Sequence, residues 1–217
     1  MNKLRFAILF AQAIIGCFFC LSSNAQTKAD IFKKEIPMTW LGVDFSEARY
    51  FGDEGTVSAT EMKTLFSKIN YLIQAEPEKY NLPKLFYKSS VATNLLIVRQ
   101  RNDSINESKI IVYDQAELNR LDTAKVIDLI SHYEMGNVKG LAVVFFMEGM
   151  NKTTEQASIW VTFFNADDKK VLLTARITGD AGGVGFRNHW ATSALEVMKK
   201  IYSKEYKKWQ QPVAPAK

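Results

Sequence analysis

The chain has 217 residues, 47% of them hydrophobic, and a formal net charge of +5 at pH 7. Its length suits one domain with a sizeable core. The positive charge is a poor reason to expect nucleic-acid binding, because the lysines that cluster near the C-terminus have the usual pattern of a solvated helix face. We therefore expect no nucleic-acid partner.

Residues 1–25 have the three-part pattern of a secretory signal peptide. A basic start precedes an apolar run at residues 6–21, and Ser23 and Ala25 fit the −3 and −1 positions of a cleavage site. The run falls short of the about 20 apolar residues that a spanning helix needs. We expect cleavage after Ala25, no transmembrane segment in the cleaved chain, and a periplasmic or secreted protein, with association with the outer membrane as a further option.

An alternative processing route is lipidation of Cys17, because residues 14–17 have the pattern of a bacterial lipobox. The apolar residues after Cys17 make this route less favoured, since lipoproteins usually turn polar there. Both cysteines of the chain, Cys17 and Cys20, lie in the leader. The cleaved chain then has no cysteine, which excludes disulfides, thiolate metal sites and cysteine nucleophiles. Loss of Lys3 and Arg5 also lowers the formal net charge from +5 to +3.

Residues 26–211 are expected to form a single domain, followed by a disordered tail at residues 212–217 that contains two prolines. The first predicted strand covers residues 38–45. A helix follows, with Ser58 as N-cap and Glu61 completing a capping box. Its apolar side chains recur at helical spacing: Met62, Leu65, Phe66, Ile69, Leu72 and Ile73.

The middle of the chain carries weaker patterns. Residues 91–98 are apolar and predict a short strand, and the polar residues 99–109 predict a loop. A second helix begins after Asp122, a favourable N-cap, and ends before Gly136. We expect it to bury four side chains: Val126, Ile127, Ile130 and Tyr133.

Three strands are predicted next, at residues 141–147, 158–164 and 171–178. The first is apolar throughout, as in a strand covered on both faces, and a hairpin turn at residues 165–169 joins the other two. A glycine-rich connection then leads to a long closing helix. This order predicts an α/β (α+β) fold, with a mixed sheet of about five strands and about three helices in a two-layer or three-layer sandwich. Helices gathered on one face are the first expectation.

The main candidate site is the glycine-rich connection at residues 179–189. Four glycines in seven residues allow positive φ and the close approach of a ligand, and the helix N-terminus behind them favours an anion, as does Arg187. A dinucleotide fingerprint is incomplete, since Asn188 takes the place of its third glycine. The structural alternative is a crossover in which Phe186 and Trp190 hold the helix start on the core. The candidate binding residues are Asp44, Asp180, Gly182, Gly183, Gly185, Arg187, Asn188 and His189.

Motifs for catalysis or metal binding are weak. His132 and His189 are the only histidines and lack the spacing of a zinc site, and the sequence has no Gly-x-Ser-x-Gly nucleophile motif. Asp44, Glu47 and Arg49 lie at the end of the first strand and beyond it, and form a minor candidate for a polar edge site. We expect no catalytic residue, no metal and no cofactor.

Three segments together resemble a group of uncharacterised secreted proteins of Gram-negative bacteria: Trp40-Leu41-Gly42-Val43-Asp44-Phe45-Ser46, Phe163-Phe164-Asn165, and Gly183-Val184-Gly185-Phe186-Arg187-Asn188-His189-Trp190-Ala191. The resemblance covers most of residues 36–201 and bears on the fold rather than on the chemistry. More distantly, the strand hairpin at residues 157–178 and the loop and helix at residues 179–200 are similar to the periplasmic α/β domain of the curli-secretion-channel subunit family. That similarity implies a role in envelope assembly and no enzymatic activity. This chain departs from the family because it lacks a convincing lipobox and a channel-forming segment.

The expected function is that of an exported, non-enzymatic binding or assembly module of the bacterial cell envelope. Self-association is an option, because the strand at residues 159–164 is apolar on both faces and needs cover from a helix, a partner subunit or a membrane. The alternative is small-ligand or anion binding, with or without enzymatic turnover, at the loop 179–189. A third interpretation is a structural component without a discrete site.

Overall fold

The computed structural model describes residues 26–52 and 57–211. The predicted signal peptide, the lipobox at Cys17 and the predicted tail at residues 212–217 lie outside these residues. The strands are β1 (Met38–Asp44), β2 (Arg49–Phe51), β3 (Val91–Thr93), β4 (Leu141–Asn151), β5 (Gln156–Asn165) and β6 (Val171–Asp180). The α-helices are α1 (Ala59–Ala75), α2 (Leu82–Leu85), α3 (Leu96–Asp103), α4 (Thr123–Ser131), α5 (Phe186–Lys200) and α6 (Tyr206–Gln210). The shorter helical segments are η1 (Lys28–Phe32), η2 (Glu107–Lys109), η3 (Gln115–Asn119) and the π-helical turn η4 (Ile201–Glu205).

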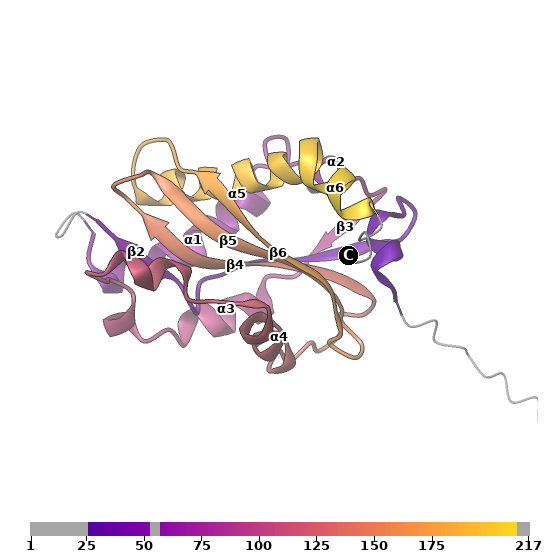
Figure 1. The fold of residues 1–217 in the computed structure, drawn as a ribbon, viewed down its shortest axis with the longest axis horizontal. Helices are drawn as coiled ribbons and strands as arrows, with labels where there is room; N and C mark the ends of the chain where they lie inside the picture. The colour runs from indigo at the N-terminus through magenta and orange to yellow at the C-terminus, as the bar shows by residue number, and fades with distance from the viewer. Residues whose placement is uncertain (1–25, 53–56, 212–217) are drawn as a thin grey trace, which may run out of the picture.

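The described strands form one mixed sheet in the order β3-β1-β4-β5-β6, with β2 beside the end of β4 (Figure 1). β1 runs parallel to β3 and to β4, whereas β5 and β6 are added antiparallel. From β1 the chain passes through α1 to β3 on one side, then through α3 and α4 to β4 on the other side. The chain therefore changes direction across the sheet between β1 and β4.

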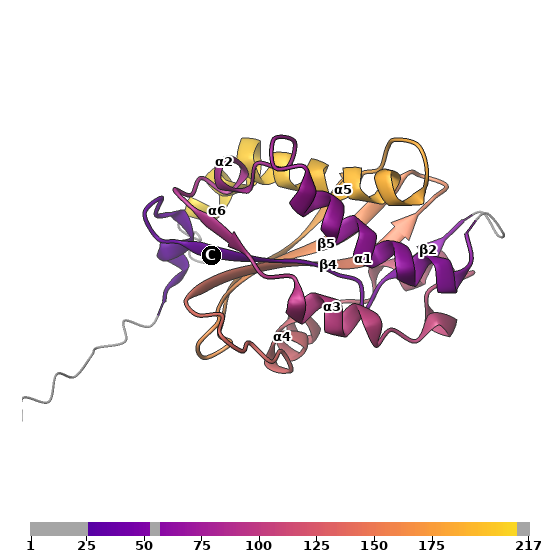
Figure 2. The ribbon, with the colours of Figure 1, turned by 180° about the vertical axis from the view of Figure 1, so that it is seen from behind.

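Helices cover both faces of the sheet (Figures 1 and 2). One face, called the α1/α5 face, is also covered by α2 and α6 and buries Trp40 and Phe145. The opposite face, called the α3/α4 face, buries Leu41 and Phe146. The sandwich thus has three layers, and the expectation of helices on one face only is wrong because all of β4 is buried and its alternating side chains need cover on both sides. None of the described helices is long and apolar enough to cross a membrane.

The two-sided apolar strand is explained within the chain. Phe163 of β5 lies in the core of the α1/α5 face, and its neighbour Phe164 lies in the core of the α3/α4 face. Both side chains are fully buried under helices of the same chain. The observation that suggested self-association therefore needs no partner subunit to account for it.

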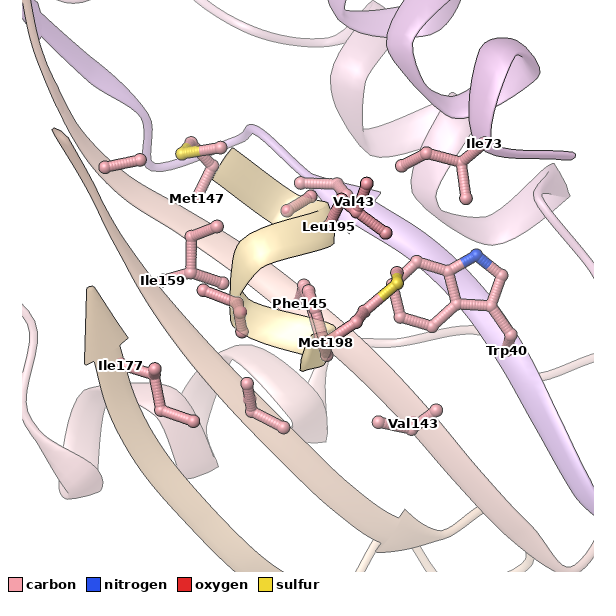
Figure 3. Close-up of a cluster of buried hydrophobic side chains, with 14 of the residues drawn as sticks. Trp40, Val43, Ile73, Val143, Phe145, Met147, Ile159, Ile177, Leu195 and Met198 are labelled. Atoms are coloured by element: carbon pink, nitrogen blue, oxygen red, sulfur yellow. The ribbon is translucent and has the colours of Figure 1, made fainter. Parts of the chain in front are cut away.

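The α1/α5 face carries the larger core. Trp40 and Val43 of β1, Phe145 of β4 and Met198 of α5 belong to this core, and Figure 3 shows Met198 beside Trp40. The rings of Trp40 and Phe145 contact edge to face, with 4.8 Å between their centroids. α5 approaches β6 so closely that a Cβ at Gly179 would collide with the backbone carbonyl of Ser193. This first glycine of the glycine-rich connection therefore serves helix–sheet packing.

Local sequence patterns predict the helix starts better than the middle of the chain. Ser58 caps α1 and Asp122 caps α4, each accepting a hydrogen bond from the backbone N–H three residues later, at 3.2 and 2.8 Å. Ile127 of α4 is 47% exposed, against the expectation that it is buried. The loop predicted for residues 99–109 is also wrong, because α3 continues to Asp103 and η2 follows. The buried side chains of α3 are too few to give a recognisable apolar period.

A bulge in β1 turns Asp44 toward the α3/α4 face. Trp40 and Val43 are three residues apart, yet both lie in the core of the α1/α5 face, because the pairing of β1 with β4 shifts register between them. Gly42 permits the bulge with a φ of +106°, which side-chain-bearing residues avoid. Without this extra residue, the alternation along the strand would place Asp44 on the α1/α5 face.

Two buried asparagines complete the hydrogen bonding of this segment. β3 pairs with β1 only as far as Trp40, so the following residues lack a strand partner on that side. Asn70 of α1 accepts from the Val43 N–H at 2.7 Å and donates to the Val43 carbonyl at 2.8 Å. Asn102 of α3 accepts from the Phe45 N–H at 2.7 Å and donates to the same carbonyl at 3.2 Å. Asp44 is thereby held between two anchored residues.

Candidate functional site

A large cavity opens where β1 ends. It has a volume of about 680 Å³ and is lined by the segment after β1, by α3, and by the segments that follow α3, η3 and α4. In open α/β sheets, ligands bind outside the carboxyl ends of the strands, at the point where the chain changes direction across the sheet. The cavity lies at that point, between β1 and β4. Its volume is within the range of small-molecule sites.

An ion pair with a buried carboxylate holds one of the arginines of this site. Asp44 is fully buried, and its Oδ2 accepts hydrogen bonds from Arg101 Nε and from the Tyr133 hydroxyl, both at 2.6 Å. Its Oδ1 accepts from the Ser46 N–H at 2.7 Å. The Arg101 guanidinium also donates to Ser46 Oγ at 3.1 Å and lies over the Tyr133 ring, 4.8 Å from the centroid. These contacts fix the orientation of the guanidinium at the cavity wall.

The charge states of this group follow from its surroundings. Burial lowers the pKa of Arg101, but Asp44 and Tyr133 outweigh that effect and the net pKa is raised, so the side chain stays protonated. Burial, reinforced by the Asp44 carboxylate, raises the pKa of Tyr133 well above its usual value. Tyr133 therefore remains a neutral donor to Asp44.

Two more arginines face the same cavity. Arg120 donates to the Glu47 carbonyl and to Glu47 Oε2, both at 2.7 Å, while its Nε is buried and has no hydrogen-bond partner among the described residues. Burial lowers the pKa of Arg49, and the nearby Arg120 lowers it further. An unpaired guanidinium N–H beside a second arginine is costly unless an anion compensates it.

The cavity wall is rich in positive charge. Arg49, Arg101 and Arg120 are joined by Lys109 and Lys125, against two acidic side chains, Glu47 and Glu134. The remaining polar lining residues offer amides, hydroxyls and an imidazole: Ser46, Gln100, Ser104, Asn106 and His132. Such a wall suits an anion that also carries hydrogen-bonding groups. In the described part of the chain, no group of three or more His, Cys, Asp or Glu side chains is placed to hold a metal ion.

A second ion pair with a buried carboxylate, Glu148 with Arg176, is hydrogen-bonded within the protein. Glu148 of β4 is fully buried and accepts hydrogen bonds from Arg176, Ser158 and Trp160 and from the Leu121 N–H. Arg176 donates in turn to the Leu121 carbonyl at 2.6 Å. Both oxygens of Glu148 are thus engaged, and this pair joins β4, β5 and β6 to the segment before α4.

The glycine-rich connection lies apart from this cavity. Gly183 and Gly185 have φ values of +93° and +80°, which confirms the expected positive φ. The Gly182 N–H donates to the His189 carbonyl at 3.1 Å. Asp180 is exposed; it accepts from Gln156 Nε2 at 3.0 Å and pairs with Lys200 at 3.7 Å.

Arg187 and Asn188 of the connection form hydrogen bonds within the connection itself. Arg187 is exposed, and its Nε donates to Asn188 Oδ1 at 3.1 Å, while Asn188 Nδ2 donates to the Val184 carbonyl at 3.1 Å. His189 is buried beside a cavity of about 190 Å³ that Gly183 and Gly185 also line. Its Nε2 has no partner among the described residues, and burial lowers its pKa. Asp44 does not join this group, because its carboxylate is engaged by Arg101 and Tyr133.

The large cavity lies at the minor candidate site predicted from the sequence, the polar edge after the first strand, and not at the main candidate, the glycine-rich connection. Glu47 and Arg49 line the 680 Å³ cavity, as expected for a polar edge site after the first strand. Asp44 is fully buried and contacts two lining residues, Arg101 and Tyr133. Sequence patterns miss Arg101 and Arg120 because Arg101 is 57 residues from Asp44 along the chain and Arg120 is 73 residues from Glu47. No pattern in a single sequence marks Arg101 as a neighbour of Asp44 or Arg120 as a neighbour of Glu47.

Comparison with known protein families and with curated proteins finds no match for this chain. The fold and the cavity alone therefore define the class to which it is assigned: a three-layer α/β protein with a basic pocket at the carboxyl end of its first strand.

Proposed function

We propose that this protein binds a small anionic molecule in the cavity beyond β1, and that it does so as an exported, non-enzymatic module of the bacterial cell envelope. The observation that carries the binding proposal is the convergence of Arg49, Arg101 and Arg120 on one cavity, with the Nε of Arg120 buried and unpaired. The proposal of export depends on the leader pattern of residues 1–25. This function places the anion at β1 and not at the loop 179–189.

The arginines of this site are pre-organised to different degrees. Asp44 and Ser46 hold Arg101 before any ligand arrives, so its remaining N–H groups present a fixed fork. Glu47 holds one end of Arg120 in the same way. Fixed donors lose little side-chain entropy on binding, which favours affinity for a carboxylate or a phosphate.

The same contacts favour binding over turnover. The Tyr133 hydroxyl is directed at the buried Asp44, and the Glu47 carboxylate is engaged by Arg120. A general acid or base has to lie within hydrogen-bond reach of the reacting group, and these groups are occupied by one another. Tyr133 and Glu47 therefore contribute to holding the arginines in place rather than acting as a free acid–base pair.

Isothermal titration of the purified domain with citrate and with inorganic phosphate tests this function. We expect saturable binding that R120A weakens at least tenfold and R49A weakens by a smaller factor. R187A is the matched control, because Arg187 is an exposed arginine of the glycine-rich connection that pairs with Asn188. Unchanged affinity in R120A, together with a loss in R187A, would overturn the assignment and return the anion to the loop 179–189.

A further inference from the structure

A second cavity, of about 550 Å³, lies among η1, α2 and the end of the C-terminal helical segment. Figures 1 and 2 show α2 and α6 side by side at the end of the molecule opposite β2. The cavity is lined by residues from segments far apart in the sequence: Phe32, Tyr87, Lys88, Tyr202, Tyr206 and Lys207 are among them. It is separate from the site at β1, which shares none of its lining residues.

Aromatic rings form one wall of this cavity. The rings of Tyr87 and Tyr202 stack with 4.7 Å between centroids and an interplanar angle of 20°, and Tyr206 lies 5.3 Å from Tyr87. Phe32 contacts Tyr206 edge to face at 5.4 Å. Tyr87 is 41% exposed, although the stack covers part of its ring. The stack therefore leaves aromatic surface open to a ligand, and flat rings are the groups that stack best on it.

Two backbone irregularities place these rings. Tyr87 has a φ of +50°, in the left-handed region that a bulky residue occupies only at a cost. Its hydroxyl donates to the Tyr202 carbonyl at 2.8 Å, which ties the strained residue to the π-helical turn η4. Single π-helical turns inside α-helices are frequently found at functional sites. Strain and a helix irregularity therefore meet at the same aromatic stack.

A buried ammonium group completes the cavity. Lys88 is only 3% exposed, and its Nζ donates to the carbonyls of Asp30 and Lys33 at 2.9 and 2.8 Å. An ammonium has three donors, so one remains, and Lys88 forms no ion pair with a carboxylate of the described residues. Three further lysines line the cavity, Lys34, Lys84 and Lys207, and its described lining includes no aspartate or glutamate.

We infer that this second cavity binds a small anion carried on a flat ring, such as an aryl phosphate or an aryl carboxylate. The ring stacks beside Tyr87 and Tyr202, and the anionic group supplies the counter-charge that Lys88 lacks. The rim lysines add attraction at longer range. Neither half of such a ligand satisfies the site alone, because a bare anion leaves the aromatic wall uncovered and a neutral ring carries no counter-charge for the ammonium.

Titration with three matched probes separates the two contributions. In R120A, in which the phosphate site at β1 is weakened, we expect phenyl phosphate to bind at least tenfold more tightly than inorganic phosphate or benzyl alcohol. K88M removes the charge while it keeps the length of the stem, and we expect it to lower phenyl phosphate affinity at least tenfold. Because K88M also removes two internal hydrogen bonds, Y87G is the second variant. It deletes a ring, and glycine accepts the local backbone conformation without strain.

Two controls keep this inference distinct from the proposed function. R120A removes an anion-binding side chain of the cavity at β1. We expect it to leave phenyl phosphate binding in the second cavity intact. Y113A removes a 76% exposed tyrosine elsewhere and is expected to have no effect. In R120A, phenyl phosphate that binds no better than inorganic phosphate would overturn the inference, and so would equal binding of phenyl phosphate to folded Y87G and to the wild type. Loss of that binding in R120A would do so as well.

Discussion

Asp44 and Arg101 form an ion pair in which the Asp44 side chain is fully buried, while the Arg101 side chain is 22% exposed at the cavity wall. The pair joins β1 to α3 at 2.6 Å. Its geometry serves two purposes, because the carboxylate needs a partner for its charge and the arginine needs a fixed position to receive a ligand. Stability and ligand binding are therefore coupled at this point.

Replacing Arg101 should show how much the ion pair contributes to the stability of the fold. R101M leaves the Asp44 carboxylate buried with Tyr133 and Ser46 as its remaining donors, and we expect it to lower the free energy of unfolding by about 3 kcal/mol. Urea unfolding followed by circular dichroism measures the change. R99A is the matched control on the same helix, since the exposed Arg99 approaches Asp103 only at 4.0 Å. Equal stability of the two variants would contradict the role of the buried pair.

The bulge at Gly42 should be intolerant of a side chain. G42A demands a φ of +106° from alanine and places its Cβ 2.7 Å from Asn70 Oδ1, which already accepts from the Val43 N–H. We expect a loss of about 2 kcal/mol or more in the free energy of unfolding. G136A provides the comparison, because Gly136 also has a positive φ, of +54°, but a Cβ at this position would meet no described atom within 4 Å. Similar losses in both variants would show that the contact with Asn70 is unimportant.

Lys88 should make stability depend on pH in a defined window. Burial lowers its pKa to about 8 in the folded protein, against smaller opposing effects of Glu35 and Asp30, while the unfolded chain has the ordinary value of 10.5. Between these values the unfolded state holds more protons, so the free energy of unfolding should rise with pH, by up to about 1.4 kcal/mol per unit. The groups around the ammonium are the carbonyls of η1 and its neighbour Lys33, together with the cavity lysines and tyrosines.

The comparison of wild type with K88M isolates this effect. Tyr80 and Tyr206 have raised pKa values in the folded protein, so they lower stability only as pH rises past about 10, and they do so in both proteins. We expect the stability difference between wild type and K88M to change steadily from pH 7.5 to pH 9.5. A difference that stays constant over this range would show that Lys88 does not change its protonation there.

The local elements of this fold are more predictable than its site. The strand at β1, the caps Ser58 and Asp122 and the order of β4, β5 and β6 follow from periodicity and capping chemistry, which act within a few residues. α3 escapes prediction because its buried side chains are few. The sequence groups Asp44 with Arg187, whereas the bulge at Gly42 turns it to the opposite face of the sheet. That outcome depends on how β1 pairs with β4, and a single sequence does not report pairing register.

The arginines illustrate the same limit. Arg101 lies in a predicted loop and Arg120 has no distinguishing neighbours in the sequence, so nothing local connects them to Asp44. Their convergence results from two crossings of the chain over the sheet. Parallel sheets gather residues from distant segments at their carboxyl ends, which is why such sites emerge only once the topology is known.

The location of a bound anion tests the central proposal most directly. A crystal of the domain soaked in tungstate, an oxyanion similar in shape to phosphate, would show the bound ion by anomalous scattering. We expect a tungstate ion between the guanidinium groups of Arg49, Arg101 and Arg120, and no such ion at that position in R120A. Tungstate bound instead at the N-terminus of α5 beside Arg187, or an empty cavity at β1 under saturating conditions, would contradict the proposed function.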